Sequence, residues 1–233
     1  MKIFVDSGHN YKGADTGAIG DGCREQDITF EIGNRLRKLL ENCGHSVKMS
    51  RESKEISLGK TVKESLKKRC DMANEWGADL FISIHTNAGG GRGTECFVYS
   101  KNSSAFAVAE RIQEKITKGL ETVSRGVKEG KSLYVLKNTN APAILVETAF
   151  IDNREDREKL TERADDFAKA IFEGITGETG KAEELIEIND IVWELFTRGI
   201  ISDKALWLEK LKQDTNAYWL AQKTIKYIRE RNV

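Results

Sequence analysis

The stretch LFISI, residues 80–84, decides the fold, and His85 follows it directly. It is the most apolar of five short runs in the chain, and a short apolar run followed by polar, turn-forming residues is typical of a β-strand. The other four runs are IFV at 3–5, VKM at 47–49, CFVY at 96–99 and AILV at 143–146. Five strands are therefore predicted.

Helical periodicity fills the segments between these runs. Apolar residues recur at the spacing of one helix face over 26–43, 58–76, 104–120 and about 154–174. Gly44 and Gly77 follow the first two segments, where a helix commonly ends. Alternating strands and helices predict an α/β fold: a mostly parallel, twisted sheet flanked by helices.

The pattern changes near Gly177 and Gly180, which predicts two domains. We expect one larger α/β domain over 1–176, a linker at 177–182 and a small all-helical domain over 183–233. Three of the four tryptophans lie in this last segment, which has few residues to build a core. They are interpreted first as core side chains and second as a binding surface.

Composition excludes several classes of partner. Lys and Arg number 37 and Asp and Glu also 37, so no excess charge favours nucleic acid or an anionic membrane. No run approaches the roughly 20 apolar residues that cross a bilayer. The first residues do not form a signal peptide. The sequence therefore predicts synthesis in the cytoplasm, with no nucleic-acid or membrane partner. It indicates no oligomeric state.

Two histidines and two acids share one predicted edge of the sheet. His9 and His85 follow the strands at 3–5 and 80–84, Glu147 follows the strand at 143–146, and Glu25 closes the loop after the first strand. Ligands of open α/β sheets bind beyond the carboxyl ends of the strands. The third histidine, His45, precedes its strand and is expected at the opposite edge.

Two neutral imidazoles and one or two carboxylates suit Zn²⁺. Three protein ligands leave a position open for catalysis, whereas a fourth closes the site and makes it structural. A single histidine at a strand end is more commonly a structural hydrogen-bonding residue. Two at the same edge, with acids beside them, favour a metal site.

Four ordered motifs resemble the amidase-3 family of zinc-dependent N-acetylmuramoyl-L-alanine amidases. They are VDSGH at 5–9 with DTGA at 15–18, REQD at 24–27, SIHTNA at 83–88 and PAILVETAFIDN at 142–153. The resemblance covers about residues 1–175. It implies that His9, Glu25 and His85 bind one Zn²⁺ and that Glu147 is the catalytic acid and base.

The resemblance implies hydrolysis of the amide bond between N-acetylmuramic acid and L-alanine in peptidoglycan. The alternatives are a non-catalytic wall-binding relative and a zinc peptidase that cuts within the stem peptide. Without a signal peptide, we expect a phage or prophage endolysin released through a holin-type pore, or a related wall hydrolase acting when the host or mother cell lyses. The segment 183–233 is expected to bind a secondary wall polymer or to mediate association.

Two further motifs are interpreted as structural. The basic residues of 60–69 (Lys60, Lys63, Lys67, Lys68 and Arg69) are expected on a solvated helix face. GVKEGKS at 126–132 resembles the end of a P-loop but lacks its first glycine, because Arg125 stands there.

Overall fold

The computed structural model describes residues 1–178 and 180–231. The chain divides into two compact units, Met1–Glu178 and Thr179–Val233. The predicted linker at 177–182 spans this division; its residue 179, and 232–233 of the last predicted domain, lie outside the described residues. In the described part of the chain, no helix is both long and apolar enough to span a membrane.

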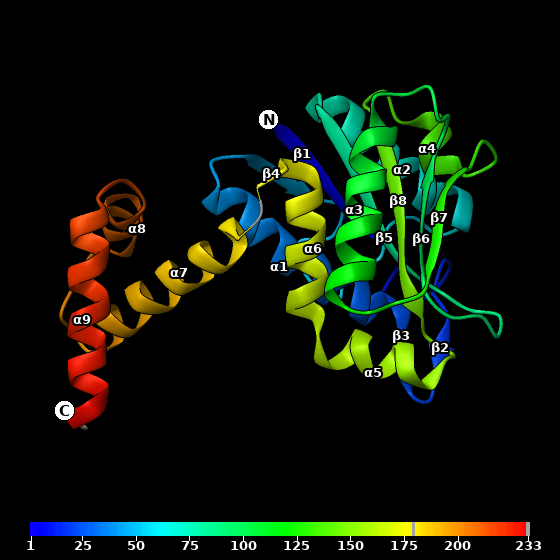
Figure 1. Ribbon diagram of the computed structural model, residues 1–233. Helices are drawn as coiled ribbons and strands as arrows, with labels where there is room; N and C mark the ends of the chain where they lie inside the picture. The colour runs from blue at the N-terminus through cyan, green and yellow to red at the C-terminus, as the bar shows by residue number, and fades with distance from the viewer. Residues whose placement is uncertain (179, 232–233) are drawn as a thin grey trace. The chain divides into compact units, whose positions relative to one another are not determined.

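The first unit is built on a six-stranded mixed sheet with the strand order β4-β1-β5-β8-β6-β7 (Figure 1). Its strands are β1 Lys2–Ser7, β4 Ser46–Met49, β5 Leu80–Asn87, β6 Thr94–Val98, β7 Ser124–Glu129 and β8 Ala143–Phe150. All neighbouring pairs are parallel except β6 and β8. The predicted α/β class with a mostly parallel sheet is confirmed.

Helices cover both faces of this sheet (Figure 1). They are α1 Glu25–Asn42, α2 Val62–Trp76, α3 Ala105–Gly119, α4 Tyr134–Asn138, α5 Arg154–Glu162 and α6 Ala164–Thr176. α6 packs between α1 and α3 on one face, and α2 packs with α4 on the other. A two-stranded ribbon, β2 Ile19–Gly20 and β3 Cys23–Arg24, precedes α1.

Alternating side chains of the strands supply the two halves of the core. Phe4 and Phe81 stack on the α2 face with their ring centroids 5.6 Å apart, in one cluster with Cys70 and Leu145. Burying both faces fixes the register of the central strands. It also forces the residues after β1, β5 and β8 to emerge at one edge of the sheet.

Several sequence predictions of elements and their bounds were wrong. The strands predicted to end before His85 and Glu147 continue to Asn87 and Phe150. The segment 154–174 is two helices, because Arg163 leaves the helical region at φ −122° and its Nε donates to Asp166 Oδ2 at 2.8 Å. The segment 58–76 begins as a loop and becomes helical only at Val62. The edge strand β7 was missed, because its exposed, charged sequence SRGVKE lacks the apolar run of a central strand.

The described residues of the second unit form the helices α7 Lys181–Thr197, α8 Lys204–Gln213 and α9 Thr215–Arg231. Its core is aliphatic: Ile188, Ile191, Val192, Leu195, Ile201, Leu211, Ala221 and Ile225. Trp207 packs against this core, whereas Trp193 and Trp219 are 58% and 57% exposed. The expectation that the tryptophans are core side chains was therefore wrong for Trp193 and Trp219.

Candidate metal centre and catalytic carboxylate

Three predicted site residues meet at one point. His9 follows β1, Glu25 is the first residue of α1, and His85 lies in β5. His9 Nε2, His85 Nδ1 and Glu25 Oε1 form a triangle in which each pair of atoms is 3.2 Å apart. Ligands of a tetrahedral zinc ion, with bonds of about 2.0–2.2 Å, lie roughly 3.3–3.5 Å from one another. The triangle therefore has the donor types and the dimensions of a three-ligand zinc site.

The backbone is shaped to bring these side chains together. His9 has a φ of +63°, a left-handed conformation that is uncommon for residues other than glycine. A Cβ on Gly8 would lie 2.5 Å from the ring of His85, and a Cβ on Gly17 would lie 2.7 Å from the side chain of Glu25. Glycine at both positions lets the main chain pass against the triangle.

Glu25 is held ionised and in place. Its Oε2 accepts a hydrogen bond from Ala18 N and its Oε1 accepts one from Thr86 N, both at 2.9 Å. Burial opposes the charge, but hydrogen bonds and attraction from the two imidazoles outweigh it and hold the pKa of Glu25 well below its usual range. Glu25 is thus an acceptor at any ordinary pH, as a metal ligand must be.

Asp15 orients His9. Its Oδ1 lies 3.2 Å from His9 Nδ1, on the far side of the ring from the triangle. Although burial opposes it, hydrogen bonds to Asp15 and Glu25 raise the pKa of His9 to about 9. A carboxylate on the outer nitrogen of a ligating histidine fixes the ring and its tautomer. Asp15 therefore aims Nε2 at His85 and Glu25.

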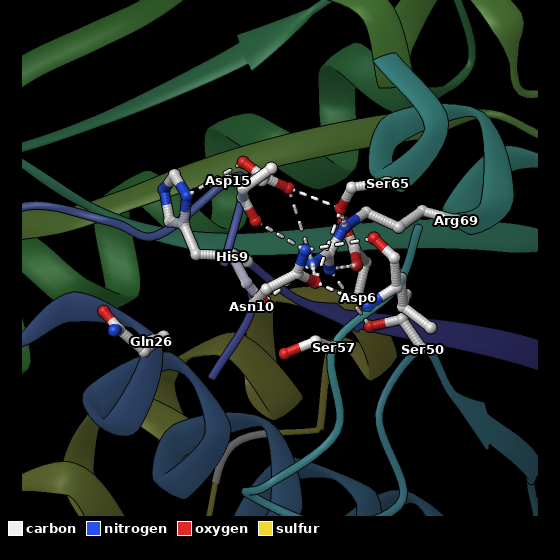
Figure 2. Close-up of polar contacts among 12 residues, drawn as sticks. Asp6, His9, Asn10, Asp15, Gln26, Ser50, Ser57, Ser65 and Arg69 are labelled. Carbon is white, nitrogen blue, oxygen red and sulfur yellow. Dashed lines mark hydrogen bonds and ion pairs between the residues drawn. The ribbon is translucent and has the colours of Figure 1, made fainter. Parts of the chain in front are cut away.

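Arg69 connects the Asp15–His9 pair to buried residues of the sheet and of α2 (Figure 2). The guanidinium, 1% exposed, donates to Asp6 Oδ1 at 2.6 Å and to His9 O at 2.7 Å. Ser65 Oγ, one turn earlier on α2, donates to Asp15 Oδ2 at 2.5 Å. The expectation of a solvated position was wrong for Arg69, because Ser65, Arg69 and Ala73 recur every four residues on the inner face of the helix.

Glu147 stands beside the triangle in a contrasting environment. It pairs with His85 in the register of β5 and β8. Within the described residues, its Oε2 is buried and has no hydrogen-bond partner. Burial first, and then repulsion from Glu25 and Glu95, raise the pKa of Glu147 to about 7. The structure thus holds a carboxyl group that exchanges a proton near neutral pH, next to a ligand triangle.

A cavity of about 440 Å³ opens over the site. The four predicted residues all line it, together with the side chains of Asn87 and Tyr134. The glycine-rich segment beyond is fixed to the sheet end, because Gly89 N and Gly90 N both donate to Asp152 Oδ2 at 2.7 Å. His45 lies at the other edge, 3.4 Å from the N-terminal amine, as expected.

Comparison with known proteins identifies the first unit. Residues 3–177 match the model of the family described as N-acetylmuramoyl-L-alanine amidase. The chain belongs to the N-acetylmuramoyl-L-alanine amidase family. The amidase CwlM of Bacillus licheniformis is 40% identical over 177 residues, which make up 75% of this chain and 65% of that protein. The endolysin of Bacillus phage SPP1 is 33% identical over 180 residues, 74% of this chain and 62% of the endolysin.

A solved member of the family has the same fold. The CwlD amidase from Clostridioides difficile, in complex with the GerS lipoprotein, superposes with a TM-score of 0.70 at 31% identity, over 76% of this chain and 96% of that one. This chain spans just under two thirds of the length of CwlM and of the phage endolysin. The match of the family model ends at residue 177, before the second unit begins.

Proposed function

We propose that this chain is a zinc-dependent hydrolase of the amide bond between N-acetylmuramic acid and L-alanine in peptidoglycan. One observation carries the proposal: the 3.2 Å triangle of His9, Glu25 and His85 lies beside a buried carboxyl group, Glu147, that has no partner in the described residues. Membership in the amidase family supports the choice of bond.

His9, Glu25 and His85 would hold the metal, and the open corner faces the cavity. A zinc ion bound there supplies Lewis acidity, which activates water and polarises the amide carbonyl. The chain's own contribution to this step is orientation. Asp15 fixes one imidazole, and the two backbone amides that donate to Glu25 hold its carboxylate in place.

Glu147 would move the protons. As the carboxylate, it accepts a proton from the attacking water; as the acid, it returns a proton to the nitrogen of L-alanine when the bond breaks. A general acid and base works best when its pKa lies near the working pH. The buried position of Glu147, which raises its pKa to about 7, meets that requirement.

Digestion of purified cell walls tests the proposal. The account predicts new amino termini of L-alanine, detected by mass spectrometry, and loss of this release when a chelator removes the metal. New termini of another residue would instead support a peptidase that cuts within the stem peptide. No release would support a non-catalytic wall-binding relative, and release indifferent to the chelator would contradict the dependence on zinc.

We further propose that the helical segment 183–233 binds a secondary wall polymer and so anchors the enzyme to the wall, or that it mediates association of the enzyme. The exposed rings of Trp193 and Trp219 support a binding role. Cosedimentation of an inactive Glu147→Gln chain with intact walls should weaken when Trp219 is replaced by alanine; unchanged binding would contradict the role of that ring. We also propose where the enzyme acts. It would reach the wall after release through a holin-type pore, or when the host or mother cell lyses.

A further inference from the structure

A second polar cluster lies on the sheet beside Glu147. Glu95 of β6 is the direct cross-strand partner of Glu147 in β8, so the two side chains stand on the same face. Arg125 Nε donates to Glu95 Oε2 at 2.8 Å, and Lys128 Nζ pairs with the same oxygen. Asn87, which lines the cavity, donates to the other oxygen at 2.9 Å. The cluster is therefore continuous with the wall of the site.

The two cations of this cluster are more than the carboxylate needs. Like charges directly opposite on neighbouring strands are destabilising, so one cation on Glu95 is explained by the nearby Glu147. Glu95, Arg125 and Lys128 together carry a net charge of +1, which an ionised Glu147 offsets and a protonated Glu147 does not. Glu95 is 7% exposed, whereas the side chains of Arg125 and Lys128 are 37% and 41% exposed. Arg125 and Lys128 are therefore partly open to solvent, whereas the carboxylate that they share is buried.

Arg125 has binding capacity to spare. It reaches Glu95 through Nε, and its two terminal NH₂ groups make no hydrogen bond to any described residue. Its guanidinium also lies over the ring of Phe150, 5.0 Å from the centroid. A guanidinium with free NH₂ groups is suited to a carboxylate, which it binds with two parallel hydrogen bonds.

We propose that Arg125 and Lys128 form an anion subsite for a carboxylate on the peptide part of the substrate. The inference rests on the proposed function and deepens it. Neighbouring strands lie about 4.8 Å apart, so the cations gathered at Glu95 are roughly one strand spacing from Glu147. An extended peptide advances about 3.3–3.6 Å per residue. The subsite therefore selects a carboxylate on the residue that follows L-alanine.

Two synthetic muropeptides test the subsite. They are identical except that the residue after L-alanine carries a free carboxylate in one and a carboxamide in the other. The wild-type protein is expected to cut the carboxylate form with a kcat/KM about 10-fold higher, the value of one charge-assisted hydrogen bond. The ratio of the two kcat/KM values should fall in Arg125→Gln and in Lys128→Gln. It should approach one in the double variant.

The matched control is Lys131→Gln, because Lys131 is an exposed lysine just after β7 that pairs with Glu129 rather than with Glu95. It should keep the full preference. Each single variant leaves Glu95 one cation, so the single variants report on the subsite even where the double variant fails to fold. A wild-type protein that cuts both substrates equally, or single variants that keep the full preference, would overturn the proposal.

A binding measurement separates this proposal from the proposed function. Short peptides that begin with L-alanine and end in the carboxylate or carboxamide residue are titrated into the metal-loaded wild-type protein. Nuclear magnetic resonance then follows the backbone amides of Arg125 and Lys128. Shifts with the carboxylate peptide alone support the subsite even if neither muropeptide is cut, an outcome that would refute the amidase proposal. Equal shifts with both peptides, or none, would overturn the subsite.

Discussion

Two carboxylates on either side of the same site have opposite environments. Glu25, at the start of α1, accepts hydrogen bonds from two backbone amides and lies within 3.2 Å of both imidazoles. Glu147, in β8, has a buried oxygen with no partner among the described residues. Burial acts on both, yet the pKa of Glu25 is held low and that of Glu147 is raised to about 7. Partners, rather than burial, decide which carboxylate stays charged and which can exchange a proton.

Replacing each carboxylate by its amide should break this comparison most sharply. Glu147→Gln removes the proposed proton carrier and is expected to lower kcat by about 10²–10⁴-fold while zinc is still bound. Glu25→Gln removes a proposed ligand and is expected to abolish zinc binding. Wall digestion and metal analysis of the two variants, side by side, check both statements. Loss of zinc from Glu147→Gln would make Glu147 a ligand instead.

Arg69→Leu tests whether the ordered side of the site depends on its buried network. The variant leaves the buried carboxylate of Asp6 without its cation, which typically costs about 3–5 kcal/mol of stability. Urea unfolding measures the loss. The control is Arg35→Leu, which removes a surface pair with Asp165, typically worth less than about 1 kcal/mol. Equal losses in the two variants would contradict the role of the network.

Asp15→Asn tests the contribution of one contact, between Asp15 Oδ1 and His9 Nδ1, to the affinity of the site for metal. Asp15 has a φ of +65°, a conformation that asparagine tolerates. The substitution therefore keeps the backbone and removes the negative charge that faces His9 Nδ1. Loss of such an outer partner typically lowers metal affinity about 10–100-fold. Competition with a chelator measures the affinity. Asp21→Asn, at φ +48° and paired on the surface with Arg157, is the control and should leave the affinity unchanged.

The dependence of kcat/KM on pH tests the role of Glu147, the carboxylate without a partner among the described residues. Glu147 accepts a proton only when ionised, and burial raises its pKa to about 7. The account predicts that kcat/KM rises with pH, about 10-fold per unit below pH 7 and levelling off above it, provided that zinc stays bound. A profile with no acidic limb above pH 5 would mean that Glu147 is ionised throughout and that its burial does not set the rate.

The sequence predicted the fold class and the meeting of the four candidate residues at one edge of the sheet, because both follow from local signals. The apolar run before His85 specifies a strand, and parallel strands bring their carboxyl ends to one edge, although β5 continues two residues beyond His85 to Asn87. The roles of Glu25 and Glu147 came from the resemblance to the amidase family. Spacing along the chain left them interchangeable, since the partners that separate them are backbone amides and distant imidazoles.

Arg69 and Glu95 show what sequence reasoning missed. Arg69 follows two lysines in a basic segment, and only its four-residue spacing from Ser65 and Ala73 marks the inner face of α2. In the sequence, Glu95 is an acidic residue beside a predicted strand, with no motif around it. Its position opposite Glu147 depends on the antiparallel pairing of β6 with β8, which no local pattern specifies.

The most direct test of the central claim is an anomalous difference map, collected at the zinc edge from crystals of the metal-loaded protein. The account predicts one peak within about 2.0–2.2 Å of His9 Nε2, His85 Nδ1 and Glu25 Oε1, with Glu147 outside bonding distance. A peak bonded to Glu147, or no peak at the triangle in protein that cuts peptidoglycan, would contradict the account.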